Sequence, residues 1–262
     1  MADGLLIAQI SDTHIQAANP ESKARLGDLA RTVRSINALP RKPDLVIHSG
    51  DVAHDATAAD YAAARAELAR LTMPVYATVG NRDRRDPFFE AFRPDGYLPA
   101  EHHFAQYAVE VAGLAIIAID TFDDQSALGG FCSRREAILK RLLADATGRP
   151  TLVFAHHPPL ELPDMKPPLL QYRDVAEARS LADCLAGHAG LVGVIAGHVH
   201  RARSVRLGAV SLSTVPSIAA DLSREKVAET YLRRPIYHLH TVSSGGMTTQ
   251  TLMLDSAEAA AA

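Results

Sequence analysis

Short apolar runs alternate with longer segments of helical period in the first third of the chain. The runs at 5–10, 45–47 and 74–79 have the length and composition of buried strands. Between them, apolar residues recur every three or four positions at 26–36, as on one face of a helix, and a second helix is expected over about 57–71. Strands joined by helices in this order form parallel units. The pattern therefore predicts an α/β fold.

The rest of the chain predicts more strands. Segments 104–111 and 114–119 flank Ala112-Gly113, which indicates a hairpin. Other expected strands are 152–155, 191–195, 205–207, 210–213, 237–242 and 247–254, with a helix at 175–185. No internal repeat and no linker rich in Gly, Ser or Pro divides the chain. We expect one domain over 1–256 and a disordered Ala-rich tail at 257–262.

Two residue pairs have the spacing of a capping box. They are Thr57 with Asp60, and Ser133 with Glu136. Each pair precedes a segment of helical period, so each predicts the start of a helix.

Composition limits the partners and the compartment. The 262 residues are 47% hydrophobic, enough for a sizeable core, and carry a formal net charge of -3 without a long basic run. This argues against binding to a nucleic-acid polymer. Cys132 and Cys184 form no C-x-x-C motif, which fits reduced thiols. The apolar run at 5–10 is too short for a signal peptide or a membrane span, so we expect a cytoplasmic protein with no membrane partner.

Polar residues of metal-ligand type follow five of the expected strands. They lie in Ser11-Asp12-Thr13-His14, His48-Ser49-Gly50-Asp51, Gly80-Asn81-Arg82-Asp83, His156-His157-Pro158-Pro159 and Gly197-His198-Val199-His200. Taken singly, such an Asp is often a helix cap, Gly-Asn a turn, and a buried histidine a core residue. Five together favour one shared site, because ligands bind at the carboxyl edge of open α/β sheets.

The residue types indicate the metal chemistry. Imidazole together with carboxylate and amide oxygen suits Zn, Fe or Mn better than Ca²⁺. No cysteine accompanies these residues, which argues against a closed structural zinc site. Two ions about 3.5–4 Å apart can activate water and clamp both oxygens of a displacement at phosphorus. We therefore expect a dinuclear centre acting on phosphate esters.

At these residues the chain resembles the calcineurin-like metallophosphoesterase superfamily. That superfamily carries D-x-H, G-D, G-N-H-[D/E], H-H-P-P and G-H-x-H in this order. The chain has D-T-H at 12–14, G-D-V-A at 50–53, G-N-R-D at 80–83, H-H-P-P at 156–159 and G-H-V-H at 197–200. The likeness extends from Leu5 to about Leu254. Its compact length, H-H-P-P and Asp120-Thr121 most resemble the class III cyclic nucleotide phosphodiesterase and glycerophosphodiesterase branch.

The resemblance implies a four-layer αββα sandwich with two mixed β-sheets flanked by helices. It implies two divalent or trivalent metal ions, Fe, Mn or Zn. The first would be held by Asp12, His14 and His200; the second by Asn81, His156 and His198; and Asp51 would bridge them. The nucleophile would be a metal-bound hydroxide, without a covalent intermediate. The expected substrate is a small phosphodiester, with cyclic AMP favoured and a glycerophosphodiester or a phosphomonoester as alternatives. A homodimer is a further expectation.

Arg82 stands where the superfamily has a histidine that contacts the phosphoryl group and assists the leaving group. Arginine matches the geometry of phosphate but stays protonated and cannot act as a general acid. Our hypothesis is that Arg82 binds and stabilises the phosphate, together with Asn81 on the substrate side. The alternative is that Arg82 faces solvent or pairs with Asp83 or Asp86.

Other histidines allow weaker predictions. His157 is a candidate substrate contact, with a supporting or packing role as the alternative. His54 is a candidate for the cleft wall. His238 and His240 share one strand face and are expected to form a surface or interface pair. The segments 160–174 and 217–222 could influence the choice of substrate.

Competing functions lack their motifs or rest on one residue. A serine hydrolase would need G-x-S-x-G, and a dinucleotide-binding protein would need G-x-G-x-x-G after the first strand. The remaining rival is a catalytically impaired metal-binding regulatory protein, for which Arg82 is the best evidence.

Overall fold

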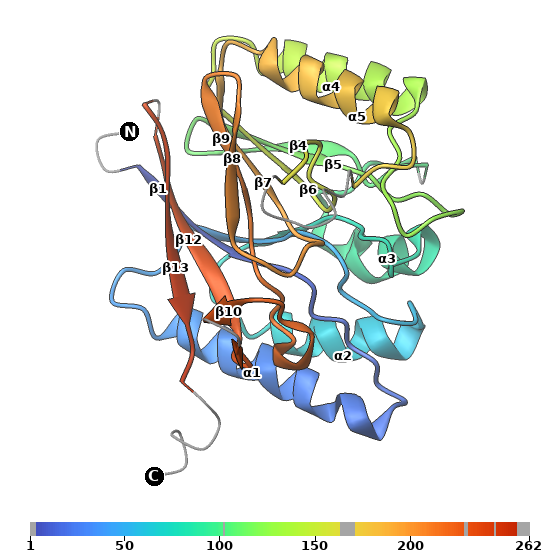
Figure 1. Ribbon diagram of the computed structural model, residues 1–262, viewed down its shortest axis with the longest axis vertical. Coiled ribbons are helices and arrows are strands. Elements are labelled where there is room, and N and C mark those ends of the chain that lie inside the picture. The colour runs from blue at the N-terminus through green and yellow to red at the C-terminus, as the bar shows by residue number, and fades with distance from the viewer. Residues whose placement is uncertain (1–3, 102, 163–170, 228–229, 244, 256–262) are drawn as a thin grey trace.

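The computed structural model describes residues 4–101, 103–162, 171–227, 230–243 and 245–255. Two β-sheets face each other, and helices cover both outer faces (Figure 1). The first sheet has the order β13-β12-β1-β2-β3. Its strands are β1 (Leu5–Ile10), β2 (Leu45–His48), β3 (Val75–Ala77), β12 (Ile236–Ser243) and β13 (Gly246–Met253). β1 runs parallel to β2 and antiparallel to β12, so this sheet is mixed.

The second sheet has the order β4-β5-β6-β7-β9-β8 and is also mixed. Its strands are β4 (Tyr107–Val111), β5 (Leu114–Ile119), β6 (Thr151–Ala155), β7 (Leu191–Ala196), β8 (Arg203–Leu207) and β9 (Val210–Thr214). A two-stranded ribbon pairs β10 (Lys226–Val227) with β11 (Thr230–Tyr231).

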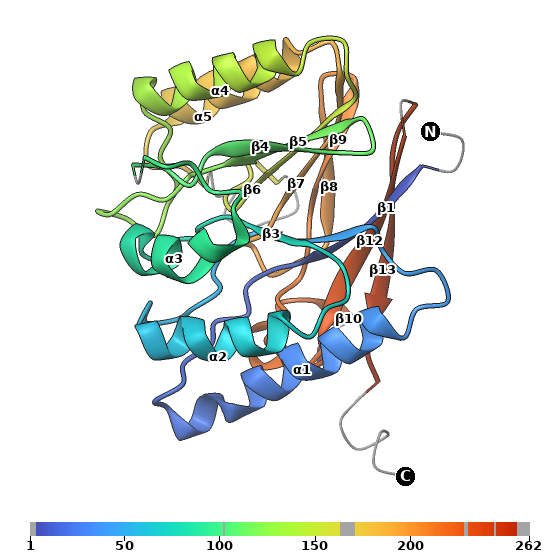
Figure 2. The same ribbon diagram turned by 180° about the vertical axis from the view of Figure 1, so that it is seen from behind.

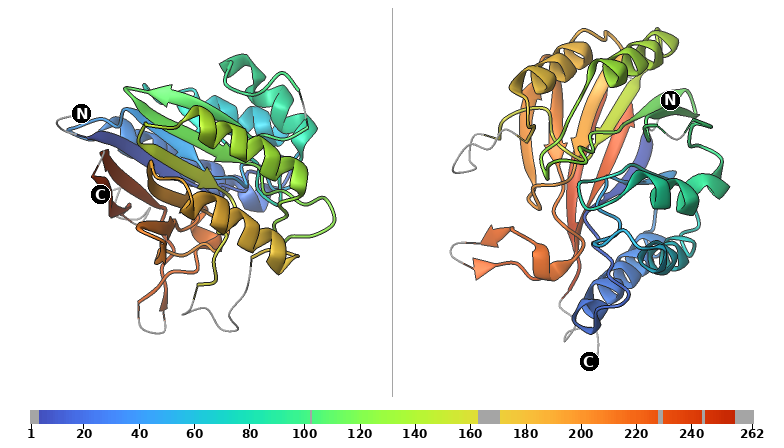
Figure 3. Two further views of the ribbon diagram at one scale, coloured as in Figure 1. Left: turned by 90° about the horizontal axis from the view of Figure 1, so that it is seen from above. Right: turned by 90° about the vertical axis from the view of Figure 1, so that its right-hand side faces the viewer.

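Five α-helices occur among the described residues. They are α1 (Lys23–Asn37), α2 (Ala58–Leu68), α3 (Arg85–Phe92), α4 (Ser133–Asp145) and α5 (Val175–Ala186). In the view from behind, α1, α2 and α3 lie on one side of the molecule, with α4 and α5 on the other (Figure 2). From above, α4 and α5 run side by side over the second sheet (Figure 3). No helix in the described ranges has both the length and the apolar character needed to cross a membrane.

Three apolar clusters hold these layers together. Leu29 of α1, Tyr61 of α2 and Phe88 of α3 pack on the outer face of the first sheet. Leu139 of α4 and Leu181 of α5 pack on the outer face of the second. The third cluster joins the two sheets, and its members include Ile7, Ile47, Ile116, Phe154 and Ile195. Burial of these branched side chains on both strand faces explains the continuous apolar runs in the sequence.

The αββα sandwich predicted from the sequence is confirmed. The capping box at Thr57 and Asp60 is also present, with both reciprocal hydrogen bonds formed. The box predicted at Ser133 is wrong. There Cys132 is the N-cap, and its side chain makes no capping hydrogen bond. Helix α3 was not predicted, although Phe88, Phe89 and Phe92 have helical spacing and are all buried. The Ala-rich tail at 257–262 lies outside the described residues.

His238 and His240 do not form the predicted surface pair. Both lie on β12, between β1 and β13, and are 2% and 0% exposed. His240 is hydrogen-bonded on both sides, through Nε2 to Gln9 Oε1 at 3.0 Å and through Nδ1 to Thr249 Oγ1 at 2.9 Å. The sequence predicted that the two histidines share one face of the strand. It did not predict that the second sheet covers this face.

Candidate metal centre

The predicted ligand segments meet at one end of the sandwich, where the loops continue the pairing of the strands. Beyond β1 and β2, the Asp12 N–H donates to the Gly50 carbonyl and the His14 N–H donates to the Asp51 carbonyl, both at 3.0 Å. In the second sheet, the Gly197 N–H donates to the His156 carbonyl at 3.0 Å. These bonds fix the loops against one another, so the side chains they carry are held in place.

The backbone at this site is strained. Seven non-glycine residues in the described part of the chain have a positive φ, and five of them are predicted ligands. Their φ values are 56° for Asp12, 45° for His14, 53° for Asp51, 69° for His198 and 55° for His200. Such conformations cost on the order of 1–3 kcal/mol each and persist only where surrounding contacts enforce them. Their concentration here marks the cluster as a functional site.

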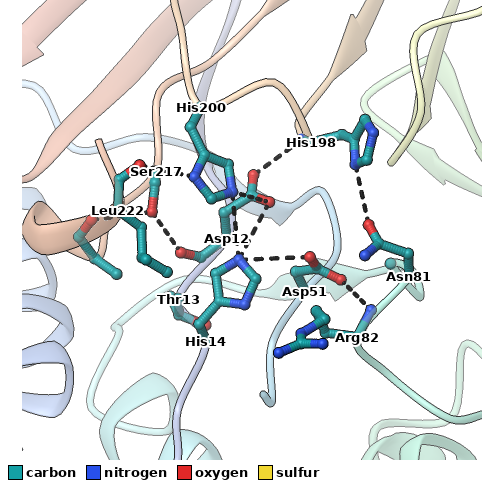
Figure 4. Close-up of polar contacts among 12 residues, drawn as sticks. Asp12, Thr13, His14, Asp51, Asn81, Arg82, His198, His200, Ser217 and Leu222 are labelled. Carbon is teal, nitrogen blue, oxygen red and sulfur yellow. Dashed lines mark hydrogen bonds and ion pairs between the residues drawn. The ribbon is translucent and has the colours of Figure 1, made fainter. Parts of the chain in front are cut away.

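Three ligand-type side chains form the first half of the site (Figure 4). Asp12 Oδ1 lies 3.1 Å from His200 Nε2, and His200 Nε2 lies 3.3 Å from His14 Nε2. The three side chains are buried or nearly so and can together hold a metal ion.

The second half is centred on Asn81. Its Oδ1 lies 3.0 Å from both His156 Nε2 and His198 Nδ1. Asp51 stands between the halves, with Oδ2 3.4 Å from His14 Nε2 and 3.5 Å from His156 Nε2. Asp12, Asp51 and His156 form a further group able to hold an ion. All seven predicted ligands are therefore brought together.

Hydrogen bonds set two of these imidazoles in the tautomer that metal binding requires. His156 Nδ1 lies 2.9 Å from the Ser49 carbonyl, and His200 Nδ1 lies 2.9 Å from the Leu222 carbonyl. A carbonyl only accepts, so each Nδ1 carries a proton and each Nε2 is the ring nitrogen that faces the cluster. The donor set thus fits a metal centre.

Electrostatics keep most of the cluster ready for cations. Burial lowers the pKa of His14 and His156 and brings that of His198 to about 3, so these rings are neutral at neutral pH. Burial opposes ionisation of Asp12, but the charge of His200 and its hydrogen bond to the carboxylate hold the pKa of Asp12 well below the usual range. Burial, with the charges of Asp12 and Asp83, raises the pKa of Asp51. Carboxylates crowded in this way gain from a bound cation.

Glycines are required where the loops touch the ligands. A Cβ at Gly80 would lie 2.3 Å from Asp51 Oδ1 and 2.4 Å from the Asp51 nitrogen. A Cβ at Gly197 would lie 2.1 Å from Ser11 Oγ and 2.8 Å from Asp12 Oδ2. Both approaches are too close for any side chain.

A buried carboxylate beneath the site was not predicted as functional. Asp83 accepts hydrogen bonds from the backbone N–H groups of Val52 at 3.2 Å, Ala53 at 3.1 Å and Gly80 at 2.9 Å. The Tyr61 hydroxyl donates a fourth at 2.8 Å. Asp83 therefore ties the loop carrying Asp51 to the loop carrying Asn81. Its place directly after Gly80-Asn81-Arg82 was visible in the sequence, but its partners were not.

Arg82 lies at the mouth of the site. Its backbone N–H donates to Asp51 Oδ1 at 2.7 Å, and its exposed guanidinium contacts His54 Nε2. His54 Nδ1 in turn lies 3.4 Å from His14 Nδ1, which places His54 beside the cluster. The exposure of Arg82 agrees with the solvent-facing part of the alternative considered for it, whereas no ion pair with Asp83 or Asp86 occurs among the described contacts.

Both ring nitrogens of His157 take part in hydrogen bonds. It is fully buried, with Nδ1 2.8 Å from Thr121 Oγ1 and Nε2 3.2 Å from the Ala127 carbonyl. Its ring packs on that of His198, with centroids 4.3 Å apart. Both nitrogens are engaged, so the geometry favours a role in positioning His198 over a substrate contact.

The segment after β9 also supports the site. Ser217 Oγ donates to the Asp12 carbonyl at 2.8 Å, and the Leu222 carbonyl accepts from His200. Of the other segment expected to affect the substrate, 160–174, residues 163–170 lie outside the described residues.

Comparisons with known proteins agree with this arrangement. The family model for calcineurin-like phosphoesterases matches residues 5–202. A probable glycerophosphodiester phosphodiesterase, GpdQ, of Arcobacter nitrofigilis is 26% identical over 94% of this chain and 92% of its own length. The 3′,5′-cyclic adenosine monophosphate phosphodiesterase CpdA of Pseudomonas aeruginosa is 26% identical over 81% of this chain and 76% of its own.

Among solved structures, a dimetal phosphatase from Danio rerio has the same fold. It covers 94% of this chain and 98% of its own with a TM-score of 0.65, at 14% identity. The family match spans most of the chain and includes every predicted ligand. The chain therefore belongs to the calcineurin-like phosphoesterase family and is a metal-dependent hydrolase of phosphate esters.

Proposed function

We propose that this chain hydrolyses a small phosphodiester at a dinuclear metal centre. Asp12, His14 and His200 would hold one ion; Asn81, His156 and His198 would hold the other; and Asp51 would bridge them. Ions bound there would activate a water molecule and offset charge on the phosphate oxygens. Their identity among Fe, Mn and Zn is part of the proposal.

The position of Asp51 supports this proposal most strongly. One of its oxygens faces His14 and His156 at nearly equal distance, and these residues come from different sheets. Its other oxygen accepts the Arg82 N–H, which fixes the carboxylate. A carboxylate held between two imidazole groups in this way suits a bridging ligand.

Arg82 would bind the phosphoryl group. Its backbone is anchored to Asp51, while its guanidinium lies exposed beside His54 at the rim of the cluster. A guanidinium offers two parallel N–H donors to phosphate oxygens. The leaving group would then take its proton from water or from another residue.

Two substrate classes have specific support. Cyclic AMP was favoured from the sequence, and one relative is named as a phosphodiesterase for it. A glycerophosphodiester is the second candidate, because the relative named for that substrate matches over more of both chains. A cytoplasmic location and a homodimer remain predictions from the sequence.

The test is turnover by protein reconstituted with Mn²⁺ and, separately, with Zn²⁺. A chromogenic phosphodiester should be hydrolysed, and Asp51→Ala should abolish hydrolysis while retaining the far-UV circular dichroism of the parent. A panel of 3′,5′-cyclic, 2′,3′-cyclic and glycerol phosphodiesters would then identify the class by kcat/KM. Absence of turnover with every metal would favour the regulatory-protein alternative.

A further inference from the structure

A cavity lies between the two sheets and shares no residue with the predicted ligand set. It has a volume of about 370 Å³ and is lined by β8 and β9 on one side and by β12 and β13 on the other. These strands lie close together in two orientations of the molecule (Figures 1 and 3). The volume far exceeds the roughly 30 Å³ of one water molecule and falls within the range of small-molecule sites.

The deepest polar group in this cavity lacks a partner. His238 is 2% exposed, and neither of its ring nitrogens has a hydrogen-bond partner among the described residues. Ser213 Oγ, on the opposite wall, also lacks one. The neighbouring His240, in contrast, is bonded to Gln9 and Thr249. Buried polar atoms are nearly always satisfied, so these atoms point to a ligand in the cavity.

The remaining walls are polar but carry little net charge. Five lining residues bear hydroxyl groups: Ser204, Ser211, Ser213, Thr249 and Thr251. The Arg203 guanidinium lies 3.6 Å from Glu225 Oε1, so its charge is offset. Burial lowers the pKa of His238 to about 4, which leaves one donor and one acceptor on its ring at neutral pH.

This lining matches a ligand that both donates and accepts hydrogen bonds without carrying charge. Each hydroxyl wall group can pair with a ligand hydroxyl in either direction. Met247 adds an apolar surface for the C–H face of such a ligand. An anion would find no uncompensated cation among the described lining residues.

We propose that the cavity between β8–β9 and β12–β13 binds a small neutral polyhydroxylated molecule, with His238 and Ser213 as its innermost hydrogen-bonding groups. The site is separate from phosphate ester hydrolysis, so its test does not depend on the substrate proposed above.

The test uses Zn²⁺-loaded protein with ¹⁵N-labelled histidine, titrated with glycerol, ribose, myo-inositol and inorganic phosphate. At least one polyol should shift the His238 ring nitrogens saturably, in the millimolar range. Ser213→Ala should weaken binding of that polyol about tenfold, and His238→Phe should abolish binding measured by calorimetry. Hydrolysis of a chromogenic phosphodiester should be unchanged in both variants.

Three results would overturn the proposal. The first is that no polyol shifts the His238 signals saturably. The second is that inorganic phosphate does so while the polyols do not, which would make this an anion site. The third is equal polyol affinity in the parent and in Ser213→Ala. Should His238→Phe fail to fold, Ser213→Ala alone decides, because it removes one hydroxyl at nearly constant volume.

Discussion

His156 and His240 are both completely buried histidines, yet their surroundings differ in every respect that matters for chemistry. His156 follows the end of β6, with Nδ1 on a carbonyl and Nε2 facing Asn81 and Asp51. His240 lies within β12 and pairs with Gln9 and Thr249 through both nitrogens. The difference teaches that burial alone does not identify a ligand. We expect a ligand where a ring nitrogen also faces a carboxylate, as Nε2 of His156 does.

The largest expected effect comes from exchanging these two histidines for alanine. His156→Ala should lower kcat/KM at least about 1,000-fold, because it removes one of the proposed metal ligands. His240→Ala should leave kcat/KM within a few-fold but lower the free energy of unfolding by about 2–4 kcal/mol, since it leaves a cavity and unpaired neighbours. Activity assays and urea denaturation measure the two quantities. Similar activity losses in both variants would break the comparison.

The second-largest loss of activity is expected from a substitution that disturbs the packing of the loops at the site. Gly80→Ala places a Cβ against Asp51, so we expect kcat/KM to fall roughly 100-fold through displacement of that carboxylate. Gly27→Ala is the matched control, since nothing lies within 4 Å of its added Cβ and it sits in α1. That variant should keep full activity. Wild-type turnover by Gly80→Ala would show that Asp51 tolerates movement.

Asp83→Asn tests whether the carboxylate beneath the site positions the ligands. The amide can keep at most part of the four hydrogen bonds that Asp83 accepts, so metal affinity should fall about 10- to 100-fold. Tyr61→Phe removes a single one of these bonds and should have a smaller effect. Competition with a fluorescent chelator measures affinity without turnover. Unchanged affinity in Asp83→Asn would assign the residue to stability alone.

Arg82→His restores the residue type that the family motif has at this position. We expect an acid-dependent limb to appear in the pH–rate profile, with kcat changing by about tenfold, because histidine can donate a proton. Arg82→Lys is the control, since it keeps the charge but cannot act as an acid near neutral pH. Kinetics that stay the same in Arg82→His would refute the phosphate-binding role of the guanidinium.

Lowering the pH should reduce the free energy of unfolding through the buried His240. Burial, with His238 as a second cause, lowers the pKa of His240 to about 3. The unfolded chain therefore binds a proton near pH 6.5 that the folded chain does not, and stability falls as pH drops through this window. At pH 5 this costs as much as about 2 kcal/mol relative to pH 8. Urea denaturation of the parent and of His240→Gln at both pH values checks this loss of stability. If the variant has the same pH dependence as the parent, His240 is not the cause of the loss.

Much of the fold and of the site could be predicted because the signals were local. Each strand with both faces buried gives an apolar run, and each proposed ligand follows such a run after a sharp turn. The positions of Asp12, Asp51 and His156 could therefore be identified without knowing which strands pair. Long-range contacts could not. The covering of His238 and His240 by the second sheet and the four bonds to Asp83 depend on residues far apart in the chain.

Smaller errors have local causes. Pro87 interrupts the apolar pattern of α3, although proline is tolerated in the first turn of a helix. At α4, Cys132 rather than Ser133 occupies the N-cap, so helix entry there does not use the hydroxyl. The sequence shows that Arg82 departs from the histidine of the family motif. Its contact with His54 is seen only in the folded structure.

The central claim is that Asp51 joins two metal sites, each formed by residues from both sheets. Anomalous diffraction from crystals grown with Mn²⁺ or Zn²⁺ tests it directly. The account predicts two peaks about 3.5–4 Å apart, both in contact with the Asp51 carboxylate. A single ion, or two ions that do not share Asp51, would contradict it.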